Sequence, residues 1–126
     1  MSDMKPKGTK IEIGGREFGL RFTLNAIDDI QDHFDTPISE LGALLDNEKT
    51  RIKTLRYLLT VLINEDIDCI ADETSEKQTH VTERWIGRNI DLHNAGKIVT
   101  AIAGALSGSM PETEDEIPNA TSGQKN

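Results

Sequence analysis

One apolar stretch, residues 50–65, constrains the fold of this chain more than any other feature. Aliphatic residues recur there at helical spacing, and Leu58 widens the stripe that they form: Ile52, Leu55, Leu59, Leu62 and Ile63. Tyr57 and Val61 make the opposite side of the same stretch apolar. A helix that is apolar around most of its circumference is buried by more than one neighbour. The sequence therefore predicts a central helix that begins at the N-cap Thr50 and carries the other elements packed around it.

Residues 9–22 predict a β-hairpin with one apolar face. Apolar residues alternate with polar ones on either side of Gly14-Gly15: Ile11, Ile13, Phe18, Leu20 and Phe22. Two glycines between such runs favour a type I′ turn, which needs positive φ at both central residues. Two strands alone are only marginally stable in water, so the apolar face must pack on the helices.

Four further helices are predicted from caps and apolar spacing. Their N-caps are Thr23, Thr36 (followed by Pro37), Thr82 and Asp91. The helix after Thr23 is expected to bury Leu24, Ile27, Ile30 and Phe34, and the helix after Thr36 is expected to bury Ile38, Leu41, Leu44 and Leu45. The helix after Thr82 is expected to bury Trp85, Ile86 and Ile90. Val81 and Ile86 lie at the two positions of a hydrophobic staple. The last helix shows a heptad-like seam of Leu92, Ala95, Val99, Ile102 and Leu106.

The segment 66–80 is polar, acidic and without apolar periodicity, so we expect a long surface loop there. Residues 1–8 are expected to form a flexible leader. From residue 108 to 126 the chain has two prolines and an acidic run, which predicts a disordered tail. The prediction is therefore a single α+β domain over residues 9–107, with a hairpin packed on about five helices.

Charge and cysteine content limit the classes of function. The formal net charge is −8, whereas a nucleic-acid binder needs clustered Lys and Arg to displace counterions from phosphates. We therefore expect neither nucleic acid nor an anionic membrane as a partner. The lone Cys69 has no disulfide partner in the chain, which favours a reducing compartment. No apolar run approaches the roughly 20 residues needed to cross a bilayer, and no signal region follows the N-terminus.

No group of residues has the spacing that catalysis or metal binding needs. Asp66, Asp68 and Asp72 suggest a calcium loop, but an EF-hand needs Gly and Glu where this chain has Ala71 and Lys77. The three histidines, His33, His80 and His93, are not at metal-ligand spacing. Cys69 lacks a flanking His or Lys that would activate it. We expect no enzyme and no cofactor.

Contacts with other chains are the remaining source of function. Trp85 is either a core residue or an interface anchor, since tryptophan is enriched at binding hot spots. The small-residue side of the last helix, with Gly96 and Ala103, could receive another helix. With Tyr57 and Val61 these are the candidate partner-binding residues. The free edge of the hairpin could also add a strand from a neighbour.

Four stretches of the chain resemble the tail assembly chaperones of long-tailed, siphovirus-type bacteriophages and related prophages and gene transfer agents. They are IEIGGREFGLRFTLNAIDDIQDHF, TPISEL, LRYLLTVLINED and TERWIGRNIDLHNAGKIVTAIAGAL, and they cover most of residues 9–107. The resemblance implies a small, non-catalytic α+β protein that coats the helical tape-measure protein before tail-tube subunits polymerise around it. It also implies the host cell cytoplasm as the site of action and the tail-tube protein as a further partner. Self-association is expected through the edge of the hairpin or the last helix. The segment 67–80 is longer than is usual in the family.

Two other classes of function stay open. One is a small acidic adaptor or inhibitor of phage origin, for example a DNA mimic that occupies a basic groove. A mimic needs carboxylates fixed in rows on ordered elements, whereas several here fall in residues 66–76 and 112–116. The other is a small-ligand enzyme, which would need a paired acid and base or a metal set.

Overall fold

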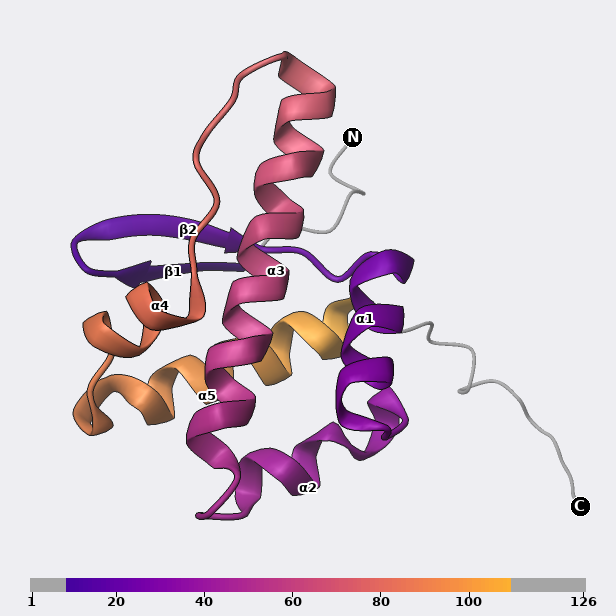
Figure 1. The fold of residues 1–126 in the computed structure, drawn as a ribbon, viewed down its shortest axis with the longest axis vertical. Coiled ribbons are helices and arrows are strands. Elements are labelled where there is room, and N and C mark those ends of the chain that lie inside the picture. Colours follow the sequence, from indigo (N-terminus) through magenta and orange to yellow (C-terminus); the bar gives the residue numbers. More distant parts are fainter. Residues whose placement is uncertain (1–8, 110–126) are drawn as a thin grey trace, which may run out of the picture.

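The computed structural model describes residues 9–109, and the predicted leader and residues 110–126 of the predicted tail lie outside that range. The α+β class is confirmed: an antiparallel hairpin precedes five α-helices (Figure 1). In chain order the elements are β1 (Thr9–Ile13), β2 (Arg16–Leu20), α1 (Leu24–Phe34), the 3₁₀ turn η2 (Ile38–Glu40), α2 (Leu41–Asp46), α3 (Arg51–Thr74), α4 (Glu83–Asn89) and α5 (Leu92–Ser109). Residues 108 and 109, predicted to belong to the tail, are the last of α5.

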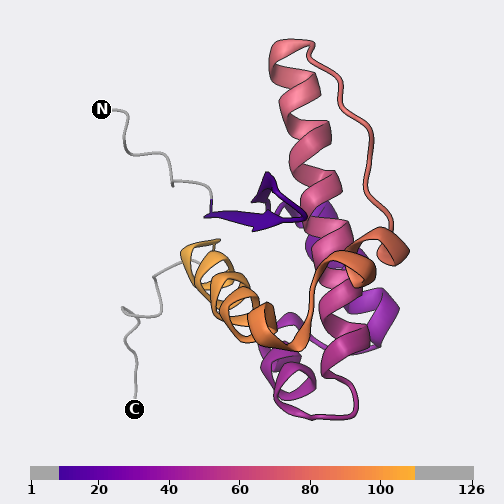
Figure 2. The same cartoon turned by 90° about the vertical axis from the view of Figure 1, so that its left-hand side faces the viewer.

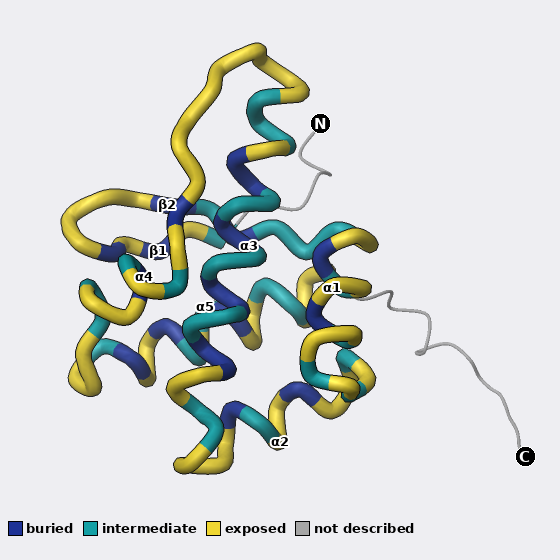
Figure 3. Tube along the Cα trace, in the orientation of Figure 1, coloured by how far each residue is buried: buried dark blue, intermediate teal, exposed yellow. Residues whose placement is uncertain are grey.

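Helix α3 is the centre of the fold, as predicted. Helices α1 and α4 flank it (Figure 1), and the hairpin lies above α5 on one side of it (Figure 2). Leu58, Leu59, Leu62 and Ile63 are completely buried, and Figure 3 shows this burial along the middle turns of α3. Ile52 was predicted to share that stripe, but it is 44% exposed because the first turn of α3 projects beyond the core.

The predicted surface loop at 66–80 is wrong over most of its length, because α3 continues to Thr74. Asp66 and Ile67 are buried, and both lie on the side of α3 that continues the core stripe. The helix ends where Ser75 takes the left-handed conformation, with φ of 68°. Contacts made by the added turns therefore favour a helix that the acidic composition does not predict.

The hairpin forms around its glycine turn, as predicted. Gly14 and Gly15 have φ of 59° and 80°, which is the positive range that a type I′ turn requires. Ile11 pairs with Phe18 across the strands. The inward face is buried, and it consists of Ile11, Ile13, Phe18 and Leu20.

The N-caps were predicted better than the helix faces. Thr23 and Thr82 accept backbone hydrogen bonds from Ala26 and Trp85 at 3.1 Å, so both predicted caps are confirmed. Thr50 occupies the predicted N-cap position of α3, but its hydroxyl donates to the carbonyl of Leu44 and accepts no backbone N–H. The predicted cap at Thr36 is wrong, because its hydroxyl donates to the carbonyl of Phe34 and Pro37 is the N-cap of η2.

Two predicted core leucines lie in solvent. Leu24 is 84% exposed and Leu92 is 82% exposed, each at the first position of its helix. In α5 the buried positions are Ala95, Ile98 and Ile102, whereas Val99 and Leu106 are only partly buried. The heptad-like seam is therefore rotated slightly from the face that packs. None of the helices within residues 9–109 has the length and apolar character that crossing a bilayer requires.

Candidate partner-binding groove

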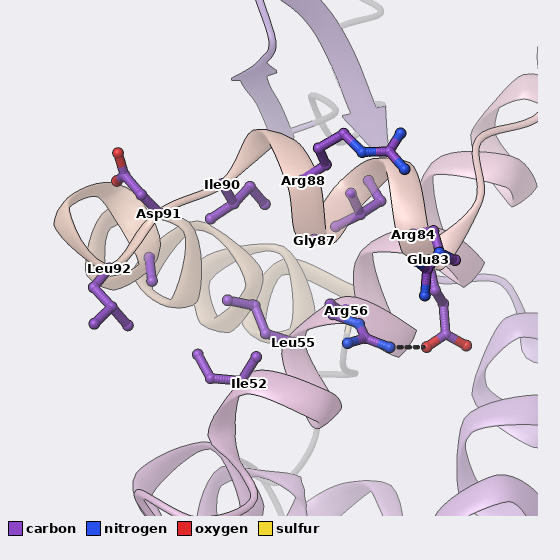
Figure 4. A pocket seen from close by; sticks show the side chains of 12 residues that line it. Ile52, Leu55, Arg56, Glu83, Arg84, Gly87, Arg88, Ile90, Asp91 and Leu92 are labelled. Atoms are coloured by element: carbon purple, nitrogen blue, oxygen red, sulfur yellow. Dashed lines mark ion pairs between the residues drawn. The ribbon is translucent and has the colours of Figure 1, made fainter.

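A groove of about 680 Å³ opens between the start of α3, helix α4 and the first turn of α5 (Figure 4). Its buried lining comes from one residue of each helix: Leu55, Ile86 and Ala95. Exposed Ile52 and Leu92 and half-buried Ile90 surround the same opening. We call this feature the α3–α4–α5 groove. Its aliphatic side chains form an apolar surface that solvent reaches.

The short link between α4 and α5 sets the shape of the groove. Ile90 ends α4 in an extended conformation, with φ of −122° and ψ of 133°. Asp91 and Asn94 then exchange two 3.1 Å backbone-to-side-chain hydrogen bonds, which fixes the start of α5 and confirms the predicted cap. Because Leu92 follows this cap directly, it lies at the mouth of the groove and not in the core (Figure 4).

Three arginines line the groove although the chain is acidic. Nη2 of Arg56 lies 3.6 Å from Oε1 of Glu83, and both side chains are partly exposed. Gly87 lets Arg56 lie close against α4, since a Cβ there would be 3.1 Å from Cδ of Arg56. Arg84 and Arg88, one turn apart on α4, are exposed and form no ion pair with any residue of the described range 9–109. The groove therefore offers two available cations beside an apolar surface.

The predicted contact residues on α3 and α4 pack mainly inside the molecule. The ring of Tyr57 stacks on His33, with centroids 3.7 Å apart, and meets the edge of Phe34. Val61 is partly buried against the core. Trp85 packs edge-on against Phe18 of the hairpin, with centroids 5.7 Å apart.

Gly96 and Ala103 are exposed on α5, two helical turns apart. A Cβ added at Gly96 would meet no atom within 4 Å, so this face is open. The five predicted contact residues thus lie on three different helices. None of them lines the α3–α4–α5 groove.

A polar cluster joins the hairpin to the second half of α3. Nε of Arg21 donates a 2.9 Å hydrogen bond to Oδ1 of Asp66, and Nη1 of Arg21 lies 3.6 Å from Glu73. The hydroxyl of Thr23 donates to the carboxylate of Glu65. Burial raises the pKa of the nearby Cys69 thiol, against the lowering effect of Arg21. This cluster therefore connects β2 and the start of α1 to the second half of α3.

Two of the three carboxylates first considered for calcium have other partners. Asp66 binds Arg21, and Asp68 lies 2.8 Å from Nε2 of His80. Between residues 9 and 109 no group of three His, Cys, Asp or Glu side chains could hold a metal ion.

Sequence reasoning missed the groove because it assigned Ile52 and Leu92 to the core. One signal could have indicated it: Arg84 and Arg88 share a helix face in a chain of net charge −8. In comparisons with known proteins, no family model matches the chain, and no curated protein or solved structure shows significant similarity to it.

Proposed function

We propose that this chain is a tail assembly chaperone that binds and solubilises a tape-measure protein before the tail tube polymerises. The proposal comes from the resemblance over residues 9–107. The structural observation that supports it is the α3–α4–α5 groove, where Ile52 and Leu92 are left in solvent around an apolar lining. A groove of this kind suits the apolar stripe of a partner helix.

Weak contacts are adequate for such a role. A tape-measure protein is long and helical and aggregates until it is enclosed. Many copies bound along one polymer raise each other's effective concentration, so a modest groove in each copy gives strong overall binding. The net charge of −8 keeps the coated complex soluble. The proposal includes the host cytoplasm as the compartment, self-association of the copies, and the tail-tube protein as a second partner.

Co-expression with a poorly soluble tape-measure fragment tests this function. We expect the chain to raise the soluble yield of the fragment and to co-purify with it. Leu92→Glu places a charge at the mouth of the groove and should reduce co-purification at least tenfold. Leu24→Glu is the matched control, because Leu24 is equally exposed but lies outside the groove. An absence of rescue and of co-purification by the wild-type chain would contradict the proposed function.

An acidic inhibitor is the second candidate, and one observation favours it. Carboxylates expected in a loop lie on an ordered helix, because Asp68, Asp72 and Glu73 belong to α3. A DNA mimic needs carboxylates on ordered elements, and these three carboxylates meet that requirement. Displacement of duplex DNA from a basic DNA-binding protein would support this candidate. The control is Asp68→Asn with Asp72→Asn, which should weaken the displacement.

A further inference from the structure

We propose that the α3–α4–α5 groove binds the acidic segment 112–117 of a second copy of this chain. Self-association is included in the proposed function. The groove and the segment, however, give it a specific site that does not depend on a tape-measure protein.

The segment and the groove have complementary chemistry. Residues 112–117 read ETEDEI, so four carboxylates precede an isoleucine. The groove presents Arg84 and Arg88 on α4, and the exposed side chains of Ile52 and Leu92 lie across its opening from them (Figure 4). Carboxylates form strong charge-assisted hydrogen bonds with guanidinium groups, often with two contacts at once. Ile117 adds an apolar side chain for the aliphatic surface. Arg56 is the third cation of the groove. Its ion pair with the partly exposed Glu83 is weak, so replacing Glu83 by a carboxylate of the segment costs little free energy.

Distance favours another copy as the source of the segment. Helix α5 begins at the groove with Leu92 and ends at Ser109, on the other side of α3 (Figure 1). Its length puts Ser109 about 26 Å from Leu92. Glu112 and Glu116 follow Ser109 by three and seven residues, so even a fully extended chain carries them at most about 11 and 25 Å. In the same copy Glu112 therefore falls short of the groove at Leu92, and Glu116 approaches it only if residues 110–116 are fully extended back along α5. A second copy can bring all four carboxylates to the groove without that constraint.

This arrangement makes the contact head to tail. Each copy would use its groove for one neighbour and its segment for another. Such an interface either closes into a ring or continues as an open polymer. Because the arginines are exposed, the association should weaken as salt rises.

Sedimentation velocity of the full chain over a concentration series tests the inference. We expect the average mass to rise with concentration at low salt. Arg84→Ala with Arg88→Ala removes the groove cations, and Glu114→Ala with Glu116→Ala and Ile117→Ala removes the segment contacts. Each variant should raise the dissociation constant at least tenfold. The matched control is Lys49→Ala with Lys77→Ala, two exposed cations outside the groove, which should associate as the wild type does.

Mixing the two variants gives the decisive result. The groove variant keeps an intact segment and the segment variant keeps an intact groove, so an equal mixture should form a dimer of one copy of each and stop there. A wild-type chain that stays monomeric at all concentrations overturns the inference. So does association that survives in the segment variant, or a mixture that stays monomeric. The tape-measure assay is separate, and its failure alone would leave this result standing.

Discussion

Arg21 and Asp66, 45 positions apart in the sequence, connect the end of the hairpin to the second half of α3 through a 2.9 Å hydrogen bond. The carboxylate is nearly buried, with 12% of the Asp66 side chain exposed, whereas the Arg21 side chain is 36% exposed. The backbone N–H of Arg21 also donates to the carbonyl of Leu62 at 3.3 Å. These contacts hold β2 against α3 at the point where sequence reasoning ends the helix.

Asp66→Ala should destabilise the protein. The substitution removes the anion that Nε of Arg21 binds and leaves the partly desolvated guanidinium with only the exposed Glu73, 3.6 Å away. Such a loss typically costs about 1–3 kcal/mol in the free energy of unfolding. Urea denaturation followed by circular dichroism measures the change. Asp72→Ala is the control, since Asp72 is exposed on the same helix and should change stability by no more than about 0.5 kcal/mol. Equal losses in the two variants would contradict the role given to Asp66.

Gly19→Ala should destabilise the same junction for a steric reason. A Cβ at Gly19 would lie 2.9 Å from Cγ of Asp66, so the carboxylate or the strand must move. Forcing an atom into packed structure costs about 1–3 kcal/mol. Gly96→Ala is the comparison, because open space surrounds that helical position and alanine favours helix by about 0.5–1 kcal/mol. Thermal melting should therefore shift in opposite directions for the two variants.

Local chemistry explains what the sequence predicts correctly. The turn at Gly14-Gly15 and the caps at Thr23 and Thr82 each depend on a few adjacent residues, so their signals are visible in the chain. The extension of α3 depends on Asp66 meeting Arg21, which no local window contains. Ile63, Ile67 and Ile70 do recur at helical spacing there, but the acidic residues between them favour a loop by composition.

The groove is a second feature that the spacing of apolar residues does not predict. Spacing identifies residues that share a helix face, but it does not say whether a neighbour covers the end of that face. Leu24, Ile52 and Leu92 all lie in a first helical turn and are exposed for this reason. Ile52 and Leu92 come together only because the cap at Asp91 sets the start of α5 beside α3.

Thr54→Val should stabilise the protein. Oγ1 of Thr54 is buried and has no hydrogen-bond partner within residues 9–109, and such a group costs about 1–3 kcal/mol. Valine keeps the branched shape and removes the polar atom. Thr60→Val is the matched control on the same helix, because the Thr60 hydroxyl donates a 2.8 Å hydrogen bond to the carbonyl of Arg56. We expect chemical denaturation to show a gain for Thr54→Val and no gain for Thr60→Val.

Ionisation of Tyr57 should make stability fall in alkaline solution. Burial raises the pKa of Tyr57 above its ordinary value of 10.0, and the charges of Asp29, Glu83 and Asp32 add to this effect. Between the ordinary and the raised pKa, the native state keeps a proton that the unfolded chain loses, so the free energy of unfolding decreases as pH rises from about 10. Tyr57→Phe should remove this part of the decline.

Because the chain contains a single tyrosine, the ultraviolet absorbance of tyrosinate reports Tyr57 alone. The titration midpoint of the folded chain should lie above that of the chain in denaturant. The stack with His33 keeps the phenol in its half-buried position, so His33→Ala should move the midpoint back toward the denatured value. Coincident midpoints in the folded and denatured chains would show that the ring is in solvent, and would contradict the packing of Tyr57, on α3, against His33 and Phe34 of α1.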